Sequence, residues 1–501
     1  MALVVETTKG RIEGRSKDGV QLFAGIPYAA PPVGALRFAP PAPHPGWSGT
    51  RETKRFGTVA PQGVGVTTML AGVNEAPSWA EDCLFLNVQT PAADDSRRPV
   101  MVWIHGGGFT SGAGSVPWYN GSAFVRHGEV VVVSINYRLG AFGWSHLADF
   151  DSELPASGNA GLLDQIAALE WVRDNIAALG GDPGNVTIFG ESAGGMSVAA
   201  LMAAPAAAGL FHKAVAQSGA AHSTRRADQA TEVTSRLLAT LGVTGVAGLR
   251  GIEAARLLEA QEQVEADLLR EPDTGALAYC PVVDGAVLPE PPPHAIAAGS
   301  SAGVALLTGT NRDEWNLFAA MGRSQADEDA IVRRLGRIID DPKSFLDIYR
   351  KVHDGKDHDA LWSAIMTDRV FRIPCLKLAE AQSYHQPANT FLYQFDFASP
   401  AFDGRLGSCH ALEIPFVFDN LHQPGVSFFA GPNAPQSIAD VMHRAWIAFA
   451  RDGHPGHDGL PMWPAYDRIE QATMHFDMAC EVRYGEYADV RSAWEEATPA
   501  H

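Results

Sequence analysis

The fold of this chain is decided by the stretch Val186-Thr187-Ile188-Phe189-Gly190-Glu191-Ser192-Ala193-Gly194. It starts with four residues of high β-propensity, continues as G-x-S-x-G and leads into small and apolar residues over 193–203. A buried strand, a sharp turn with the serine at its tip and a helix account for this order. The pentapeptide alone would also suit an ordinary glycine-rich turn. The two flanking segments favour the strained turn, in which residues around the serine need little or no side chain to avoid clashes.

Other short apolar runs end in the same way, at glycine, asparagine or a polar loop. They cover residues 100–104, 130–135, 304–308 and 391–395. Their apolar residues are continuous and do not alternate with polar ones, which is typical of strands buried on both faces of a sheet. Helical patterns, such as those over 161–179 and 437–451, lie between the runs. The sequence therefore predicts an α/β fold with a mostly parallel central sheet and helices on both of its faces.

Two further segments of the chain have helical composition. They lie near residues 224–271 and 324–381, and the first is rich in Ala, Leu and Glu. We interpret both as helical insertions that cover the sheet, not as separate domains. The chain 1–501 is accordingly expected to form a single domain.

Charge and cysteine content exclude several classes of function. The 57 acidic and 38 basic side chains give a formal net charge of −19, which disfavours nucleic acid and anionic membranes as partners. No long uncharged apolar run suggests a membrane span, and the first residues lack the pattern of a signal peptide. The five cysteines are scattered, without a C-x-x-C pair, which indicates neither a disulfide scaffold nor a zinc site and favours a cytoplasmic location.

A second glycine-rich motif, His105-Gly106-Gly107-Gly108, directly follows the apolar run at 100–104. Consecutive glycines leave backbone N–H groups bare, so that they can approach a substrate oxygen. Such donors stabilise the oxyanion of a tetrahedral intermediate in acyl transfer. The alternative, a phosphate-binding loop, needs a following Lys-Ser/Thr, and Phe109-Thr110 does not supply it.

An activated serine needs a base, and the base needs an acid that orients it. His410 lies in a polar loop after the apolar run at 391–395, and Glu314 lies just beyond the run at 304–308. Loops beyond the ends of parallel strands converge at one edge of the sheet. Asp313 is a direct rival for the acid, and Asp284 is a lesser one that also fits a turn.

Taken in order, the motifs resemble those of the type-B carboxylesterases, the family that includes cholinesterases and bacterial para-nitrobenzyl esterases. The matching strings are Phe23-Ala24-Gly25-Ile26-Pro27-Tyr28, Glu81-Asp82-Cys83-Leu84, His105-Gly106-Gly107-Gly108, Asn136-Tyr137-Arg138, Phe189-Gly190-Glu191-Ser192-Ala193-Gly194-Gly195, His410-Ala411-Leu412-Glu413-Ile414-Pro415 and Trp463-Pro464. They extend over nearly the whole chain. The resemblance implies the α/β-hydrolase fold and carboxylic ester hydrolysis.

The resemblance also implies roles for particular residues. Ser192 corresponds to the nucleophile, His410 to the general base and acid, and Glu314 to the orienting carboxylate. The remaining implied groups are the oxyanion-hole residues Gly107, Gly108 and Ala193, the supporting polar residues Glu191 and Ser218, and the structural ion pairs Arg37–Glu81 and Arg138–Asp164. No metal or organic cofactor is implied.

Two positions depart from the family pattern. Trp315 follows the acid where the family usually has glycine, which could reshape the pocket wall or shift the acid loop. Ala60 stands where secreted members have the partner of the cysteine in the second motif, so Cys83 is expected to be unpaired.

The expected reaction is two-step acyl transfer on small to medium, largely neutral esters. Activity should fall on the acid side as His410 becomes protonated, near the ordinary histidine pKa of about 6.5. A catalytically inactive binding scaffold of the same fold is the alternative from another class, and an intact serine, glutamate and histidine argue against it. Lactones, carbamates, amides and the oligomeric state are left open by the sequence.

Overall fold

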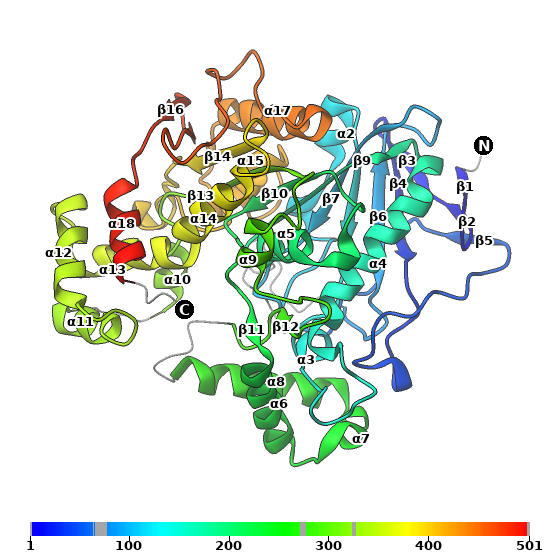
Figure 1. Ribbon diagram of the computed structural model, residues 1–501. Coiled ribbons are helices and arrows are strands. Elements are labelled where there is room, and N and C mark those ends of the chain that lie inside the picture. The colour runs from blue at the N-terminus through cyan, green and yellow to red at the C-terminus, as the bar shows by residue number, and fades with distance from the viewer. Residues whose placement is uncertain (1–2, 64, 66–77, 271–276, 323–326, 498–501) are drawn as a thin grey trace.

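The computed structural model describes residues 3–63, 65, 78–270, 277–322 and 327–497. Within them, eleven strands form one sheet (Figure 1). In spatial order the strands are β16 (Glu481–Arg483), β15 (Thr473–Phe476), β14 (Thr390–Phe395), β13 (Ala305–Asn311), β10 (Lys213–Gln217), β9 (Gly181–Glu191), β7 (Arg98–Ile104), β8 (Val131–Ile135), β6 (Phe85–Thr90), β4 (Val20–Pro27) and β3 (Arg15–Lys17). Pairing is parallel from β15 to β8 and antiparallel at both edges, which confirms the expected mostly parallel sheet.

Two small sheets accompany the large one. The first joins β1 (Val4–Thr7), β2 (Gly10–Glu13) and β5 (Thr50–Glu52), and the second joins β11 (Arg225–Arg226) and β12 (Val282–Val283).

The large sheet is buried on both faces. Along β7, Val100, Val102 and Ile104 belong to one apolar core, whereas Met101 and Trp103 belong to the other. Since side chains of a strand alternate between faces, the two cores lie on opposite sides of the sheet. This explains why the strands have continuous apolar sequences.

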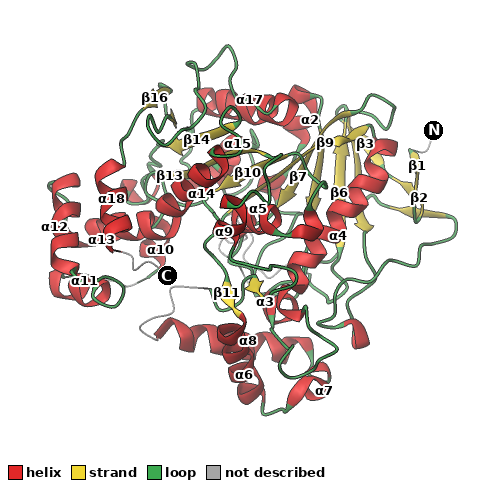
Figure 2. Cartoon of the chain, in the orientation of Figure 1, coloured by secondary structure: helices red, strands yellow, loops and turns green. Residues whose placement is uncertain are grey.

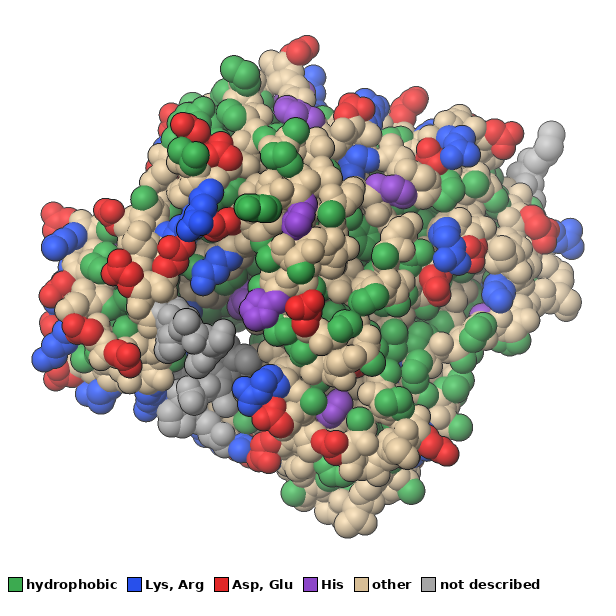
Figure 3. Space-filling model, viewed as in Figure 1, with side chains coloured by type: hydrophobic (Ala, Val, Ile, Leu, Met, Phe, Trp, Pro, Cys, Tyr) green, Lys and Arg blue, Asp and Glu red, His purple; other side chains and the backbone are tan. Residues whose placement is uncertain are grey.

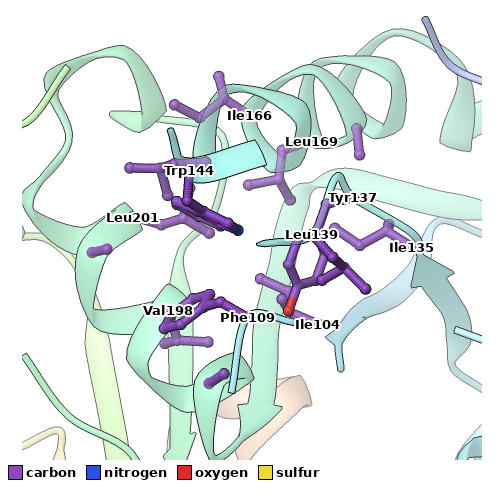
Figure 4. Close-up of a cluster of buried hydrophobic side chains, with 14 of the residues drawn as sticks. Ile104, Phe109, Ile135, Tyr137, Leu139, Trp144, Ile166, Leu169, Val198 and Leu201 are labelled. Carbon is purple, nitrogen blue, oxygen red and sulfur yellow. The ribbon is translucent and has the colours of Figure 1, made fainter. Parts of the chain in front are cut away.

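Each core is covered by its own helices (Figures 1 and 2). On one face lie α4 (Ala160–Asn175), α5 (Ala193–Ala203), α9 (Pro292–Ala297) and α14 (Ile373–Ser383). On the other lie α2 (Ser122–Gly128), α15 (Ile414–Val417) and α17 (Gln436–Asp452). Figure 4 shows part of the first core, in which Ile166 and Leu169 of α4 and Val198 and Leu201 of α5 gather around Trp144.

The remaining helices form two groups beside the sheet (Figure 1). One consists of α6 (Ala227–Leu241), α7 (Gly245–Arg250) and α8 (Ala254–Arg270), next to the short α3 (Gly140–Trp144). The other consists of α10 (Asn316–Met321), α11 (Glu328–Leu335), α12 (Pro342–Val352), α13 (His358–Thr367) and α18 (Ala488–Ala497). The short α16 (Val426–Phe429) contributes Val426 and Phe429 to the second core. Residue 271 of the first expected insertion and residues 324–326 of the second lie outside the described residues.

No helix in the described part of the chain has both the length and the apolar character that a membrane span requires. The sheet brings the ends of β7, β9 and β13 to one edge, since these strands run parallel. This edge carries the motifs that the sequence singled out.

Candidate active site

Ser192 occupies a strained turn between β9 and α5. Its backbone has φ 57° and ψ −123°, a conformation that costs a non-glycine residue free energy and persists only when its surroundings enforce it. A Cβ atom on Gly190 would lie 2.6 Å from the Ile104 carbonyl oxygen, and one on Gly194 would lie 2.0 Å from the same oxygen. The glycines of G-x-S-x-G are therefore required because the turn packs directly against the end of β7.

The loop after β7 lies beside this turn. A Cβ atom on Gly106 would lie 3.1 Å from Cβ of Ser192, and Gly107 and Gly108 both have positive φ, 117° and 62°. Within the described residues, the N–H groups of Gly107, Gly108 and Ala193 have no hydrogen-bond acceptor. Bare donors of this kind, fixed by the fold beside a serine, can stabilise a developing oxyanion.

The same loop is held in place from behind. The Tyr137 hydroxyl donates to the carbonyl of His105 at 2.7 Å, and the two rings are stacked with centroids 4.5 Å apart. Burial lowers the pKa of His105 to about 4, so its imidazole is neutral at physiological pH. A rigid, uncharged support keeps the glycine backbone in its unusual conformation.

His410 and Glu314 lie together at this edge of the sheet. Nδ1 of His410 is 2.7 Å from Oε2 of Glu314, and both side chains are buried. The second oxygen of Glu314 accepts the backbone N–H of Asn311 at 2.7 Å. With both carboxylate oxygens bonded, Glu314 can fix the tautomer and the orientation of the imidazole.

The two rival acids have other partners. Asp313 accepts the backbone N–H of Ser408 at 3.0 Å and the Nε–H of Arg312 at 3.1 Å. Asp284 accepts the N–H groups of the turn that follows it, such as that of Val287 at 2.8 Å. Both carboxylates therefore hold loops, and neither contacts His410.

Glu191 lies on the other side of the imidazole. Its Oε1 is 3.1 Å from Nε2 of His410, and no group among the described residues donates a hydrogen bond to this buried oxygen. Burial, with Glu413 and Glu314 nearby, raises the pKa of Glu191, whereas the neighbouring His410 opposes this rise. The structure thus places this predicted supporting residue in direct contact with the imidazole.

Three carboxylates change the acidity of His410. Burial alone would lower its pKa, but Glu191, Glu314 and Glu413 outweigh burial and raise the pKa to about 9. The unperturbed histidine value of about 6.5 expected from the sequence is therefore wrong for this environment. The direction follows from charge, since anions within a few ångströms stabilise the imidazolium.

Glu413, three positions after His410, was not predicted from the sequence as a residue of the site. It is buried and accepts hydrogen bonds from Nδ2 of Asn311 at 2.7 Å and from Nε2 of Gln217 at 3.1 Å. Burial and Glu314 raise its pKa to about 7. A carboxylate in the string His-Ala-Leu-Glu-Ile-Pro, among apolar residues, was the available signal.

Ser218, the other predicted supporting residue, lies next to the turn that carries Ser192. It is fully buried with φ 48°, and its N–H donates to the Gly309 carbonyl at 2.8 Å. Its hydroxyl has no hydrogen-bond partner in the described residues. The adjoining Gly219 would place a Cβ atom 2.2 Å from the Ser192 carbonyl oxygen, so this segment abuts the turn.

Aromatic rings line one side of His410. Phe371 and Phe318 lie with ring centroids 4.7 Å and 5.1 Å from the imidazole, and Trp315 packs against Phe318 at 4.9 Å. The departure from glycine at Trp315 therefore adds a ring to this wall. Trp315 does not displace the loop after β13 that carries Glu314, because Glu314 contacts His410.

The implied structural ion pairs are present. Arg138 and Asp164 are completely enclosed and 2.7 Å apart, and Nε of Arg37 donates to Glu81 at 2.7 Å. Cys83 is buried and unpaired. Among the residues that the structure describes, no group of three or more His, Cys, Asp or Glu side chains could hold a metal ion.

The neighbouring carboxylates give a first prediction. Glu191→Gln removes the charge that raises the His410 pKa most, so the pKa should fall by about one to three units. Because the base must be neutral to accept a proton, the acid limb of kcat/KM should lie above pH 6.5 in the wild type and move to lower pH in the variant.

Measuring kcat/KM for a nitrophenyl ester between pH 5 and 10 gives the acid limb of the wild type and that of the variant. Glu413→Gln is the matched control, since Glu413 contributes the smallest of the three effects and should shift the limb less. Identical limbs in the wild type and Glu191→Gln would show that Glu191 does not act on the imidazole.

The sequence of this chain is similar to known proteins over nearly its whole length. The model of the carboxylesterase family matches residues 1–491. The chain belongs to the carboxylesterase family. It is 39% identical to the para-nitrobenzyl esterase of Bacillus subtilis (strain 168) over 483 residues, which cover 95% of this chain and 94% of that protein. It is 38% identical to the phenmedipham hydrolase of Pseudarthrobacter oxydans, with 94% of each chain covered.

Solved structures agree with this assignment. The Geobacillus stearothermophilus carboxylesterase EST55 at pH 6.2 superposes with a TM-score of 0.88 at 42% identity, covering 98% of this carboxylesterase and 100% of that chain. A para-nitrobenzyl esterase structure gives 0.88 at 37% identity, covering 100% of both chains. The protein is thus a carboxylic ester hydrolase of the serine carboxylesterase family with an α/β-hydrolase fold, as the sequence motifs predicted.

Proposed function

We propose that this carboxylesterase hydrolyses its substrates through an acyl-enzyme on Ser192. His410 takes the hydroxyl proton as Ser192 attacks the ester carbonyl, and Glu314 orients the imidazole and stabilises its charge. The same imidazole then protonates the departing alcohol. Water, deprotonated by His410, releases the acid in the second step. The observation that carries the proposal is the short contact between Glu314 and His410, whose imidazole also lies 3.1 Å from Glu191, the residue directly before a serine held at positive φ.

The oxyanion of each tetrahedral intermediate is assigned to the N–H groups of Gly107, Gly108 and Ala193. Their lack of other acceptors within the described residues supports this role. Ala193 begins α5, whose N-terminus adds a favourable electrostatic potential for the negative charge. Glu191 and Ser218 support the site from behind without contacting the reacting ester.

We further propose small to medium, largely neutral esters as substrates. The aromatic wall of Trp315, Phe318 and Phe371 offers apolar contacts, and the net charge of −19 disfavours polyanions. No nucleic acid or membrane partner is proposed. The chain is proposed to act as one domain, and the cytoplasm is the proposed compartment, because each of the five cysteines is free.

Covalent labelling tests the nucleophile. A p-nitrophenyl organophosphonate should add one phosphonyl group to the protein, abolish ester hydrolysis in proportion and map to the peptide that contains Ser192. Intact-mass and peptide mass spectrometry provide the measurement. Full inactivation with the label on another serine would refute the assignment of Ser192. The protein would still be an esterase, but with a different nucleophile.

A further inference from the structure

His410 lies among three buried carboxylates, those of Glu191, Glu314 and Glu413. On the face shown in Figure 3, Asp and Glu side chains are instead spread among Lys and Arg side chains at the surface. A buried carboxylate is stable only when hydrogen-bond donors satisfy its oxygens. Asn311, the last residue of β13, donates to two of the three carboxylates, and the mechanism proposed above gives it no role.

Every N–H group of Asn311 bonds to one of the two catalytic loops. Its backbone N–H donates to Oε1 of Glu314 at 2.7 Å. Its side-chain Nδ2 carries two hydrogens and donates to two acceptors. They are Oε2 of Glu413 and the carbonyl of Cys409, the residue directly before His410, each at 2.7 Å. One side chain therefore connects the end of β13 with the segment that carries the catalytic histidine.

The acceptors around it determine the orientation of this amide. If the group were turned over, Oδ1 would face the Cys409 carbonyl and the Glu413 carboxylate, which can only accept hydrogen bonds. As it lies, Oδ1 is buried and has no hydrogen-bond partner among the residues that the structure describes. An unpaired buried acceptor costs free energy. The two N–H donors therefore account for asparagine at this position better than stability does.

The main-chain link at the histidine itself is weak. The N–H of His410 donates to the Glu314 carbonyl at 3.3 Å, which is longer than a usual N–H···O bond. One residue earlier, the Cys409 carbonyl accepts Nδ2 of Asn311 at 2.7 Å. This shorter bond holds the main chain from which the imidazole projects. It therefore helps to keep Nδ1 of His410 at 2.7 Å from Oε2 of Glu314.

The network beyond Glu413 is anchored in the core. Gln217, at the end of β10, donates to the second oxygen of Glu413 at 3.1 Å, and its own oxygen accepts Nε1 of Trp446 from α17 at 3.0 Å. The donors to Glu413 are amides, so they satisfy its carboxylate without adding a cation to the site. Burial and Glu314 raise the pKa of Glu413, and the hydrogen bond from Asn311 opposes this rise.

We propose that Asn311 is a positioning residue, whose amide fixes the segment that carries His410 to the loop that carries Glu314. The inference rests on the proposed function, since it takes His410 as the base. Asn311 acts through the imidazole and does not contact the ester. A displacement of about 1 Å at a catalytic group can lower a rate by about 10²-fold, so removal of the amide lowers kcat and leaves KM nearly unchanged.

Asn311→Leu and Asn311→Asp test this role in the full-length protein. Leucine fills a similar volume without donors, and aspartate keeps the shape but places acceptors against acceptors. Both variants should lower kcat for p-nitrophenyl acetate by about 10- to 100-fold per active site, with KM within a few-fold of the wild type. Titration with a p-nitrophenyl organophosphonate counts the active sites, so a smaller folded fraction does not affect the result. If residue 311 only filled space, Asn311→Asp would keep the wild-type kcat.

Asn159 offers the matched control. It is buried at the start of α4, and its Nδ2 donates to the Val282 carbonyl at 2.7 Å and to the Asp284 carboxylate at 2.9 Å, the same two kinds of acceptor. Asn159→Leu should lower the melting temperature, as Asn311→Leu should, because both lose buried hydrogen bonds. Its kcat per active site should stay within a few-fold of the wild type.

The proton between Nδ1 of His410 and Glu314 gives a direct readout of the geometry. Its low-field ¹H resonance should be present in the wild type and in Asn159→Leu, but shifted or lost in Asn311→Leu. Wild-type kcat per site or an unchanged resonance in Asn311→Leu, or an equal loss of kcat in Asn159→Leu, would overturn the proposal. These results would leave the labelling of Ser192 unaffected, whereas failure of that labelling would refute the proposed mechanism itself.

Discussion

Replacement of Ser192 by alanine should lower kcat for a nitrophenyl ester by about 10⁶, the scale found when the nucleophile of a serine hydrolase is removed. The alanine has no atom that can form the acyl bond, so only binding and the oxyanion donors remain. The fold should persist, because the strained turn is held by Gly190 and Gly194 against Ile104, and not by the serine hydroxyl. Steady-state rates at saturating ester give kcat.

Ser197→Ala is the matched control for this loss. Ser197 is a buried serine of α5, five residues further along, whose hydroxyl accepts a hydrogen bond from Gln165 at 3.0 Å. It should retain a kcat within a few-fold of the wild type, and circular dichroism should show both variants folded. A folded Ser192→Ala protein with wild-type turnover would exclude the acyl-enzyme mechanism.

The elements that carry Ser192 could be predicted because local rules determine them. The β-run and the small-residue helix fix the turn, although β9 extends over Gly181–Glu191 and not only the four residues that the pattern indicated. Likewise the helix expected over 161–179 ends as α4 at Asn175 and tightens into a 3₁₀ turn over Ile176–Leu179 before Gly180. Such tightening at a helix end depends on packing and leaves little trace in the sequence.

The electrostatics of the site could not be predicted in the same way. Glu191, Glu314 and Glu413 come from three separate segments, and their effect on His410 depends on distances and burial that only the folded sheet creates. Spacing along the chain nominated His410 and Glu314 only as candidates, and the family resemblance selected them. Their contact joins residues 96 positions apart.

Glu314→Gln should lower kcat by about 10⁴, as expected when the orienting carboxylate of a triad becomes an amide of the same shape. The amide can still accept from Asn311, but it favours the wrong tautomer of His410 and cannot stabilise the imidazolium. Loss of one anion also lowers the His410 pKa, so the acid limb should move to lower pH. The maximal kcat above this limb should fall at the same time.

Asp313→Asn is the control that separates the two adjacent carboxylates. Asp313 bonds Ser408 and Arg312 but not His410, so its amide variant should lose little turnover and keep the wild-type pH limb. Measuring kcat and its pH dependence for both variants on one ester makes the comparison direct. If kcat fell more in Asp313→Asn than in Glu314→Gln, the orienting acid would be Asp313. The loop after β13 would then have to change its conformation during turnover.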